Sequence, residues 1–258
     1  MTGGDPSGTA ARASTPPVCS RREFLAYGSI FGWIPFLKPR HIQLAGARFR
    51  IVRNGRSKRR YVLIHGNEET ARQVLTQHLV ANQGIGYLVE SRTRNVKLES
   101  GLIDPNRMFS RAGAEASLKK LNPDWAPERI QAALAMLDRG REHLVHALMP
   151  PKGGLLVAVH NNSEAYSVRD EEAISDAASI REPSNPHAFF LCTDPGDFRI
   201  LSGSGYNVVQ QLHAPKVDDG SLSRLCAARG VRYVNCEVGV GHGGRQHEML
   251  DWLEWSLP

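Results

Sequence analysis

Short apolar runs of strand length alternate with helical patterns from about residue 48 to the end of the chain, and this alternation limits the possible folds more than any other feature. Residues 155–160 form a continuous apolar run that ends in a histidine, which is typical of a buried strand in a parallel sheet. Strands that alternate with helices favour a sheet covered by helices on both faces. We therefore expect one α/β domain with three αβα layers and a mixed, largely parallel central sheet.

The individual elements follow from hydrophobic periodicity and from turn residues. Two β-rich segments, 49–52 and 61–64, are separated by a polar turn with an Asn-Gly dipeptide, which predicts a hairpin. Ser221 is expected to cap a helix that ends at Gly230. Further strands are expected at 86–90, 155–160, 188–192, 208–210 and 231–237, and further helices from near residue 68 and over 127–148 and 246–255.

The N-terminal part of the chain lacks this alternation and has the features of an export signal. Residues 1–19 are rich in Gly, Ser, Thr, Ala and Pro and show no apolar periodicity. The pair Arg21-Arg22 then precedes a short apolar stretch over 26–37, and the Ala-Gly-Ala sequence at 45–47 has the small-x-small form of a cleavage site. In this order the features resemble a twin-arginine signal.

This resemblance predicts a leader with a signal segment over residues 1–47, a single domain over 48–258, and export of the folded chain to a bacterial periplasm. A basic tail that ends in an amphipathic helix is the alternative interpretation of the same residues. The apolar stretch is too short for a comfortable membrane span, so we expect no stable membrane insertion after export.

The positive charge of the chain is concentrated at its N-terminus. The formal net charge is +6, yet residues 1–60 hold 12 Lys and Arg against 2 Asp and Glu, and residues 61–258 hold 20 against 24. The body of the protein thus has no broad basic surface for phosphate backbones. We expect no nucleic-acid partner.

Three ionisable residues stand at the ends of expected strands. His65 directly follows one strand, His160 ends the apolar run described above, and Glu237 ends the strand over 231–237. Ligands of α/β sheets bind at the carboxyl ends of the strands. A buried imidazole or carboxylate is costly unless it has a polar or charged partner. These three side chains are therefore candidates for one functional site.

The spacing of these residues suits a metal ion. Glu68 lies three residues after His65, across the expected strand-to-helix turn. Catalytic zinc sites take three protein ligands from His, Asp and Glu and keep a fourth position for water. His65, Glu68 and His160 are therefore candidate ligands of one Zn²⁺ ion, and Glu237 is a candidate general base beside it. The alternative is a histidine that caps a helix at 65 and a hydrogen-bonded core histidine at 160.

The pair Asn106-Arg107 lies between the two candidate ligand segments. An arginine presents a planar fork of donors that matches a carboxylate. The pair is therefore a candidate clamp for an anionic group of the substrate. A loop arginine in a surface ion pair is the alternative.

Four segments, taken in chain order, resemble the motifs of the zinc carboxypeptidase superfamily: HGNE at 65–68, DPNRMF at 104–109, VAVH at 157–160 and VNCE at 234–237. That superfamily has a His-x-x-Glu pair, an Asn-Arg pair, a third histidine ligand and a catalytic glutamate in this order. The short separation of the second and third ligands is similar to that of its compact bacterial members, which include the succinylglutamate desuccinylase/aspartoacylase branch and the murein-peptide amidases. The resemblance covers about residues 60–240.

The resemblance implies a role for each matched residue. The family also uses an arginine to polarise the scissile carbonyl, for which Arg92 and Arg94 are candidates and Arg92 is preferred. Many of its peptidases add a late tyrosine, for which Tyr206 is the candidate. The matched roles are metal ligation by His65, Glu68 and His160, binding of a substrate carboxylate by Asn106 and Arg107, and general base catalysis by Glu237.

The implied activity is hydrolysis of an amide bond next to a free carboxylate, on small peptides such as those of the cell wall. Zinc would supply hydroxide at neutral pH by lowering the pKa of water to about 7. One alternative is deacylation of N-acyl amino acids, and another is an exported, non-catalytic module that binds an anionic peptide or glycan fragment. A serine hydrolase is disfavoured, because the Ser-Gly-Ser-Gly sequence at 202–205 lacks the G-x-S-x-G elbow.

Overall fold

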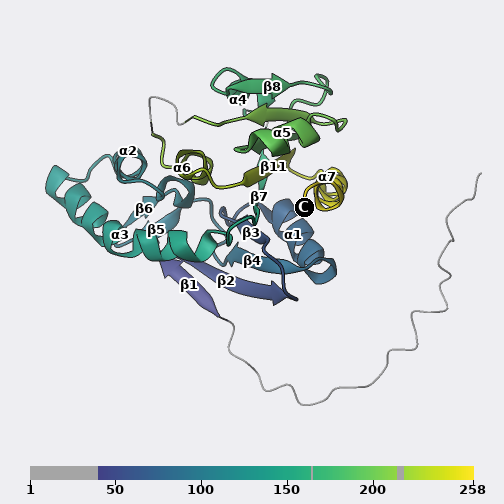
Figure 1. The fold of residues 1–258 in the computed structure, drawn as a ribbon. Coiled ribbons are helices and arrows are strands. Elements are labelled where there is room, and N and C mark those ends of the chain that lie inside the picture. The colour runs from purple at the N-terminus through teal and green to yellow at the C-terminus, as the bar shows by residue number, and fades with distance from the viewer. Residues whose placement is uncertain (1–39, 164, 214–217) are drawn as a thin grey trace, which may run out of the picture. The chain divides into compact units, whose positions relative to one another are not determined.

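The computed structural model describes residues 40–258 except residues 164 and 214–217 (Figure 1). The predicted twin-arginine pair and the apolar stretch after it lie outside the described residues. Within the described part, none of the helices combines the length and the apolar composition that crossing a bilayer requires.

Nine strands of the described residues form one mixed sheet in the order β1-β2-β4-β3-β7-β11-β9-β10-β8 (Figure 1). Its centre, from β4 to β11, is parallel, and antiparallel ladders border this centre on both sides. A separate ladder joins β5 (Val96–Leu98) and β6 (Gly101–Ile103). The strands of the sheet are β1 (His41–Leu44), β2 (Ala47–Asn54), β3 (Arg60–Leu63), β4 (Gly84–Val89), β7 (Leu156–Asn162), β8 (Ala177–Ser179), β9 (Phe189–Cys192), β10 (Asn207–Gln210) and β11 (Tyr233–Gly239).

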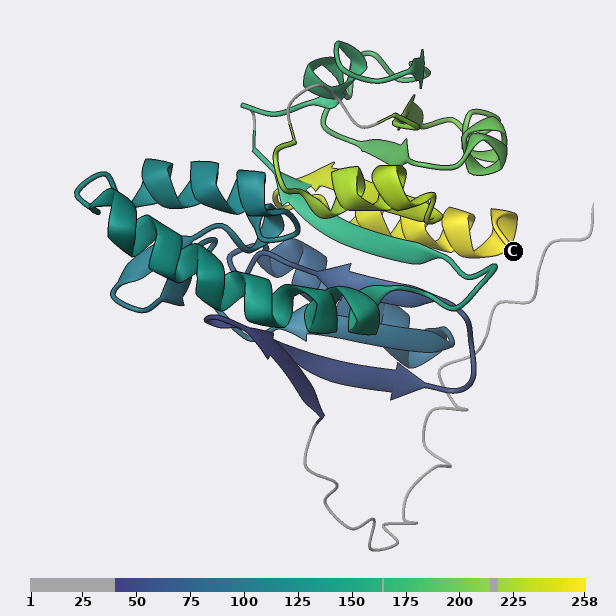
Figure 2. The same ribbon diagram turned by 60° about the vertical axis from the view of Figure 1, so that its left-hand side comes forward.

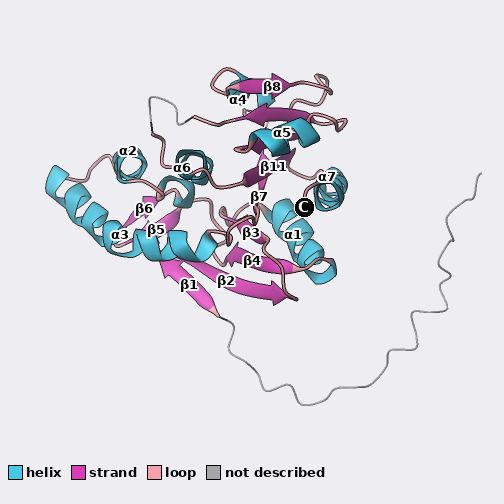
Figure 3. Cartoon of the chain, in the orientation of Figure 1, coloured by secondary structure: helices cyan, strands magenta, loops and turns pink. Residues whose placement is uncertain are grey.

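Helices cover both faces of the sheet, which confirms the predicted αβα layers (Figure 3). Side chains alternate along β3 and the residue that follows it, so that Tyr61 and Leu63 pack into one core and Val62 and Ile64 into the other. The first core contains side chains of α1 (Glu69–Ala81), α5 (Pro195–Leu201) and α7 (Gly243–Ser256). The second contains side chains of α2 (Arg111–Leu121), α3 (Pro127–Leu148) and α6 (Leu222–Arg229), and Figure 2 shows α3 in front of the strands. The short helix α4 (Val168–Glu172) lies near β10.

The chain contains the local signals that begin and end these helices. The Ser221 side chain accepts a hydrogen bond from the backbone N–H of Arg224 at the start of α6. The helix ends at Gly230, whose φ of 60° is a left-handed conformation that glycine adopts without strain. Pro127 is the first residue of α3, where its missing N–H costs no hydrogen bond. The predicted bounds of α3 and α6 are thereby confirmed.

The predicted hairpin between the segments at 49–52 and 61–64 is wrong. β2 pairs antiparallel with β1 and with β4, whereas β3 pairs parallel with β4 and with β7. β4 therefore lies between β2 and β3. A turn signal predicts where the chain reverses, but it does not determine which strands pair. Here β4, which begins 30 residues after β2 ends, lies between β2 and β3.

The folded body begins before residue 48. β1 pairs with β2 from His41↔Arg50 to Leu44↔Ala47, and the side chains of Ile42 and Leu44 are buried in the core on the α3 side. The domain boundary that the sequence predicts at residue 47 therefore falls inside this pair of strands. A cleavage there would remove an edge strand together with two buried aliphatic side chains.

We expect a chain that starts at residue 48 to be markedly less stable than one that starts at residue 40. Each buried aliphatic side chain contributes about 1.5–3 kcal/mol to stability, so the loss of Ile42 and Leu44 should lower the free energy of unfolding by about 3–6 kcal/mol. Urea unfolding followed by circular dichroism measures the difference. Equal midpoints for the two chains would show that β1 contributes nothing to the fold.

Candidate functional site

The carboxyl ends of the three central parallel strands carry the candidate site. His160 lies in β7 and Glu237 in β11, where the two residues are direct partners in the parallel ladder. His65 follows β3, the neighbour of β7 on its other side. The strand order therefore brings three residues from distant parts of the chain to one edge, as the sequence predicted.

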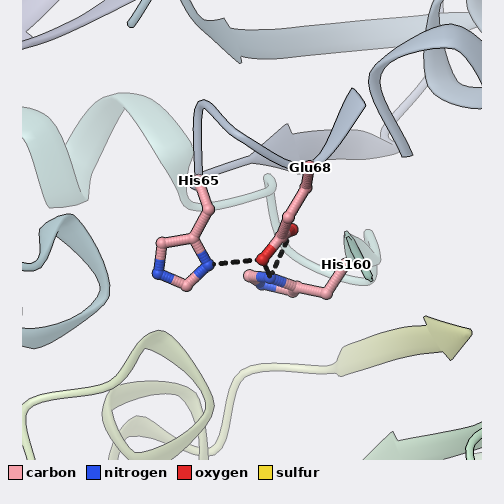
Figure 4. A group of neighbouring side chains, drawn as sticks. All are labelled: His65, Glu68 and His160. Atoms are coloured by element: carbon pink, nitrogen blue, oxygen red, sulfur yellow. Dashed lines mark hydrogen bonds and ion pairs between the residues drawn. The ribbon is translucent and has the colours of Figure 1, made fainter. Parts of the chain in front are cut away.

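His65, Glu68 and His160 form a compact, buried cluster (Figure 4). Both imidazoles turn toward the Glu68 carboxylate: Nδ1 of His65 lies 2.7 Å from Oε1, and Nδ1 of His160 lies 3.0 Å from Oε2. The ligand atoms of all three lie within 4.8 Å of one another, and the residues are only 2–4 % exposed. Two imidazole nitrogens and a carboxylate oxygen in this arrangement fit three positions of a tetrahedral zinc site.

The cluster is electrostatically suited to a cation. Burial alone would raise the pKa of Glu68, but the charges and hydrogen bonds of His160 and His65 outweigh it and lower this pKa to about 2. Burial also disfavours a charged His160, yet Glu68 and then Glu237 outweigh it and raise the pKa of this imidazole. The carboxylates of Glu68 and Glu237 therefore favour a positive charge at the centre of the cluster. A divalent ion would supply that charge.

Asp104 is a partner of the cluster that the sequence analysis missed. Its Oδ1 lies 2.9 Å from Nε2 of His65, on the side of the ring that faces away from Glu68. The same oxygen accepts a hydrogen bond from the backbone N–H of Asn106, so Asp104 caps the short 3₁₀ turn Pro105–Arg107. Burial raises the pKa of Asp104, but His65 and Arg94 outweigh it and lower the pKa well below its ordinary range. Such a carboxylate fixes the orientation of a ligand histidine.

Glu237 is buried beside the cluster and is held by two amides. Asn235 donates to its Oε1 at 3.0 Å and Asn162 to its Oε2 at 3.3 Å. Burial raises the pKa of Glu237, and the opposing attraction of His160 only partly offsets it. A carboxylate with a raised pKa, positioned by fixed donors, is suited to accept and return a proton near neutral pH.

A second network of hydrogen bonds holds the backbone of His160 in place. The side chain of Gln246, in α7, donates to the backbone oxygen of His160 at 2.7 Å. Asn161 donates to Gln246 and accepts a hydrogen bond from the backbone N–H of Ala71, in the first turn of α1. These contacts explain why Asn161 follows the candidate ligand, because its amide ties β7 to two helices.

The predicted Asn106-Arg107 pair lies at the same cavity. Oδ1 of Asn106 accepts a hydrogen bond from the backbone N–H of Leu222, which attaches the 3₁₀ turn to the start of α6. Arg107 donates to the backbone oxygen of Asn106 and lies 3.5 Å from a carboxylate oxygen of Asp219. Its guanidinium is partly exposed and borders the cavity.

Two predicted site residues are not brought to this cavity. The side chain of Arg92 is 71 % exposed and donates to Glu69, at the start of α1. Tyr206 precedes β10 and packs between Phe190 and Trp252, on the α7 side of the sheet. The turn after β4 directs Arg92 outward, and Tyr206 is separated from β11 by the intervening strand β9.

Arg94, the other candidate arginine, does border the cavity. Its guanidinium lies 3.7 Å from Oε1 of Glu68 and 3.5 Å from Oδ2 of Asp104. The cavity has a volume of about 520 Å³. A neighbouring cavity of about 840 Å³ shares Asn162, Ser163 and Val240 with it. A ligand larger than a single amino acid can therefore extend past Asn162.

Comparisons with known proteins give only distant similarities. No protein-family model matches the chain, and no curated protein matches its sequence. Among solved structures, a succinylglutamate desuccinylase from Chromobacterium violaceum is similar with a TM-score of 0.44 and 15% identity, over 85% of this chain and 69% of that chain. A protein described as a "putative metallopeptidase" from Shewanella denitrificans OS217 is similar with a TM-score of 0.44 and 12% identity, over 85% of each chain.

Proposed function

We propose that the protein is a zinc-dependent hydrolase that cleaves an amide bond next to a free carboxylate, as a carboxypeptidase does. One observation carries this proposal: three buried ligand groups within 4.8 Å of one another lie in the same cavity as a buried glutamate and an arginine. His65, Glu68 and His160 would hold the ion. Zinc held there would supply a Lewis acid and lower the pKa of water to about 7.

The other residues of the cavity supply the remaining functions. Glu237 accepts the proton of the attacking water and afterwards returns it to the leaving amine. Arg94, rather than Arg92, stabilises the negative charge that develops on the carbonyl oxygen, since it borders the cavity beside Glu68. Arg107 binds the terminal carboxylate of the substrate and thereby fixes which amide bond reaches Glu237.

The space around the site favours a peptide over an N-acyl amino acid. The amine side of the scissile bond would lie toward Arg107, and the acyl side would extend past Asn162 into the larger cavity. Deacylation of an amino acid with a short acyl group would leave that second cavity unused. Asn162 borders both cavities and Asn235 borders the smaller one.

Membership of the zinc carboxypeptidase superfamily and export to a periplasm belong to the same proposal. The order of the four motifs supports the first, and the paired arginines before a short apolar stretch support the second. A small peptide is then the partner of the site, and nucleic acid is not.

Metal analysis and hydrolysis of matched substrates test this function. We expect the purified chain to retain one zinc ion after dialysis. We also expect it to cleave N-blocked dipeptides with a free C-terminus at least about tenfold faster than their C-terminal amides, because Arg107 loses a charge-assisted contact in the amides.

The alternatives predict different outcomes of the same assay. Faster cleavage of N-acyl amino acids than of peptides would indicate a deacylase. Peptide binding without hydrolysis by the zinc-loaded chain would indicate a binding module. Absence of stoichiometric zinc would contradict the metal site itself.

A further inference from the structure

Four exposed cations lie in the two loops at the amino ends of the central strands. Arg53, at the end of β2, and Arg56 and Lys58, between β2 and β3, are exposed, and so is Lys152 in the loop before β7. The first three fall in the basic N-terminal part of the sequence, yet in the structure they belong to the folded body. These four residues are called the basic patch below.

The two loops of the basic patch pack against each other. The backbone N–H of Arg60, the first residue of β3, donates to the oxygen of Leu155 at 2.9 Å. The backbone of Gly154 lies against the backbone oxygen of Lys58. In the parallel ladder Arg60 is the partner of Leu156, so β3 and β7 begin side by side. The cations therefore form one surface.

Positive charge is in excess on this surface. Within residues 40–163, 165–213 and 218–258, none of the four side chains of the basic patch forms an ion pair. The nearby Arg59 does so, with Glu254 in the last turn of α7 at 3.4 Å. Asp251, one helical turn earlier, has a largely exposed side chain. Unpaired cations that lie close together attract a surface that carries many negative charges.

Two large apolar side chains are exposed beside the basic patch. Val80, in the last turn of α1, is 80 % exposed, and Trp255, in the last turn of α7, is 86 % exposed. The side chain of Asn54 donates to the backbone oxygen of Val80 at 3.1 Å. Arg59 donates to backbone oxygens on both sides of Trp255 in the chain. Tryptophan is enriched where proteins meet the headgroup region of a membrane.

This end of the molecule faces away from the candidate site. The helices α1 and α7 lie side by side, and His78 Nε2 lies 3.0 Å from Glu254 Oε1 near their last turns (Figure 1). Arg60 begins β3 and His65 follows its end, so about 16 Å of extended chain separates the two residues. A partner bound at the basic patch would therefore leave the cavity of the candidate site open to solvent.

We propose that this end of the molecule binds the surface of a bilayer that contains anionic phospholipids. The basic patch contacts the phosphates, and Trp255 and Val80 enter the headgroup region beside it. The contact is peripheral, because none of the described helices is long and apolar enough to cross a bilayer. This inference does not depend on the proposed function.

The apolar side chains favour a lipid surface over other polyanions. The phosphates of a nucleic acid would pair with the basic patch, but a duplex offers no apolar region to Val80 and Trp255. A second copy of the chain would bring like charges together. A bilayer surface supplies both the negative charge and the apolar environment.

Binding of the full chain to vesicles tests the role of the basic patch. We expect the chain to sediment with vesicles of phosphatidylcholine and phosphatidylglycerol, to release from them at high salt, and to bind pure phosphatidylcholine far more weakly. The triple variant Arg53→Gln, Arg56→Gln, Lys58→Gln should bind the mixed vesicles roughly a hundredfold more weakly, since each cation at such a surface contributes about a factor of five.

A matched variant controls for the loss of three positive charges. Lys97, Lys119 and Lys120 are exposed in β5 and α2, and their joint substitution by Gln changes the net charge equally. This control should bind the mixed vesicles nearly as tightly as the wild-type chain. Both variants keep the N-terminal segment, so any binding by that segment is the same in both. Equal binding by the two triple variants would overturn the proposal.

A second substitution tests the apolar part of the surface. Trp255→Gln should weaken binding to the mixed vesicles about three- to tenfold, because the exposed indole loses its contact with the headgroup region. The thermal midpoint should not change, since this side chain is 86 % exposed. Unchanged vesicle binding by Trp255→Gln, together with tighter binding of the wild-type chain to a DNA duplex at the same salt, would show that the patch serves nucleic acid and would overturn the lipid assignment.

Each of these measurements is independent of peptide hydrolysis. A chain that binds the mixed vesicles through the basic patch and cleaves no peptide would support this inference and contradict the hydrolase. A chain that cleaves peptides and binds pure phosphatidylcholine as well as the mixed vesicles, or neither, would overturn the inference and leave the hydrolase intact.

Discussion

Replacing Glu237 by Gln should remove most of the hydrolysis while the chain keeps its zinc and its fold. A glutamine has the same shape but cannot accept the proton of the attacking water, so the rate should fall roughly 10²- to 10⁴-fold. The carboxylate is separate from the three candidate ligands, and Asn162 and Asn235 hold it by donating to it. The measurement is kcat for a cleaved dipeptide, together with zinc content and the thermal midpoint.

Glu171→Gln is the matched control for this experiment. Glu171 borders the same cavity, but its carboxylate accepts from Tyr166 and Gln211 and not from the residues around the cluster. Its substitution should cost far less activity than that of Glu237. If Glu237→Gln hydrolyses peptides as fast as the wild-type chain, Glu237 is not the general base.

Replacing His160 by Ala should abolish stoichiometric zinc binding and activity together. The imidazole is one of three candidate protein ligands. Loss of a residue that only hydrogen-bonds to a ligand weakens metal binding by about 10–100-fold, and loss of the ligand itself should weaken it more. Asp104→Asn, which changes the residue behind His65, should cause that smaller loss. Competition with a chelator of known affinity measures both effects.

An exposed histidine controls for the loss of an imidazole as such. His143 lies on the exposed side of α3, and His143→Ala should bind zinc like the wild-type chain. Gln246 donates to the backbone oxygen of His160, so the strand should keep its place in the variant. Full zinc binding by folded His160→Ala would show that the ion is bound elsewhere.

The central strands and the helices α1, α3, α6 and α7 could be predicted from the sequence, because hydrophobic periodicity is a local property. The strands β1, β5, β6 and β8 and the helices α2, α4 and α5 were not predicted from the sequence. A continuous apolar run at 155–160 predicted the central strand β7, and a serine and a glycine predicted both ends of α6. The position of a histidine or a glutamate at a strand end is local in the same way. Once the strands are parallel and adjacent, His65, His160 and Glu237 have to meet at one edge.

Contacts between loops could not be predicted in this way. Arg92 and Arg94 follow the same strand and are two residues apart. The backbone path of the turn decides that Arg94 lies near Glu68 and that Arg92 lies near Glu69. Asp104 stands 39 residues after the histidine that it contacts, without any spacing rule between them. Whether Tyr206 reaches the cavity depended on the position of β10, which lies two strands away from β11 in the sheet.

The sequence by itself determined that this chain forms a layered α/β sheet and which residues end its central strands, since both depend on neighbours within a few positions. Only the tertiary structure decided that β4 inserts between β2 and β3 and that Asp104 lies behind His65. The physical reason is that these contacts join residues far apart in the chain, and the order of strands and the packing of loops set them.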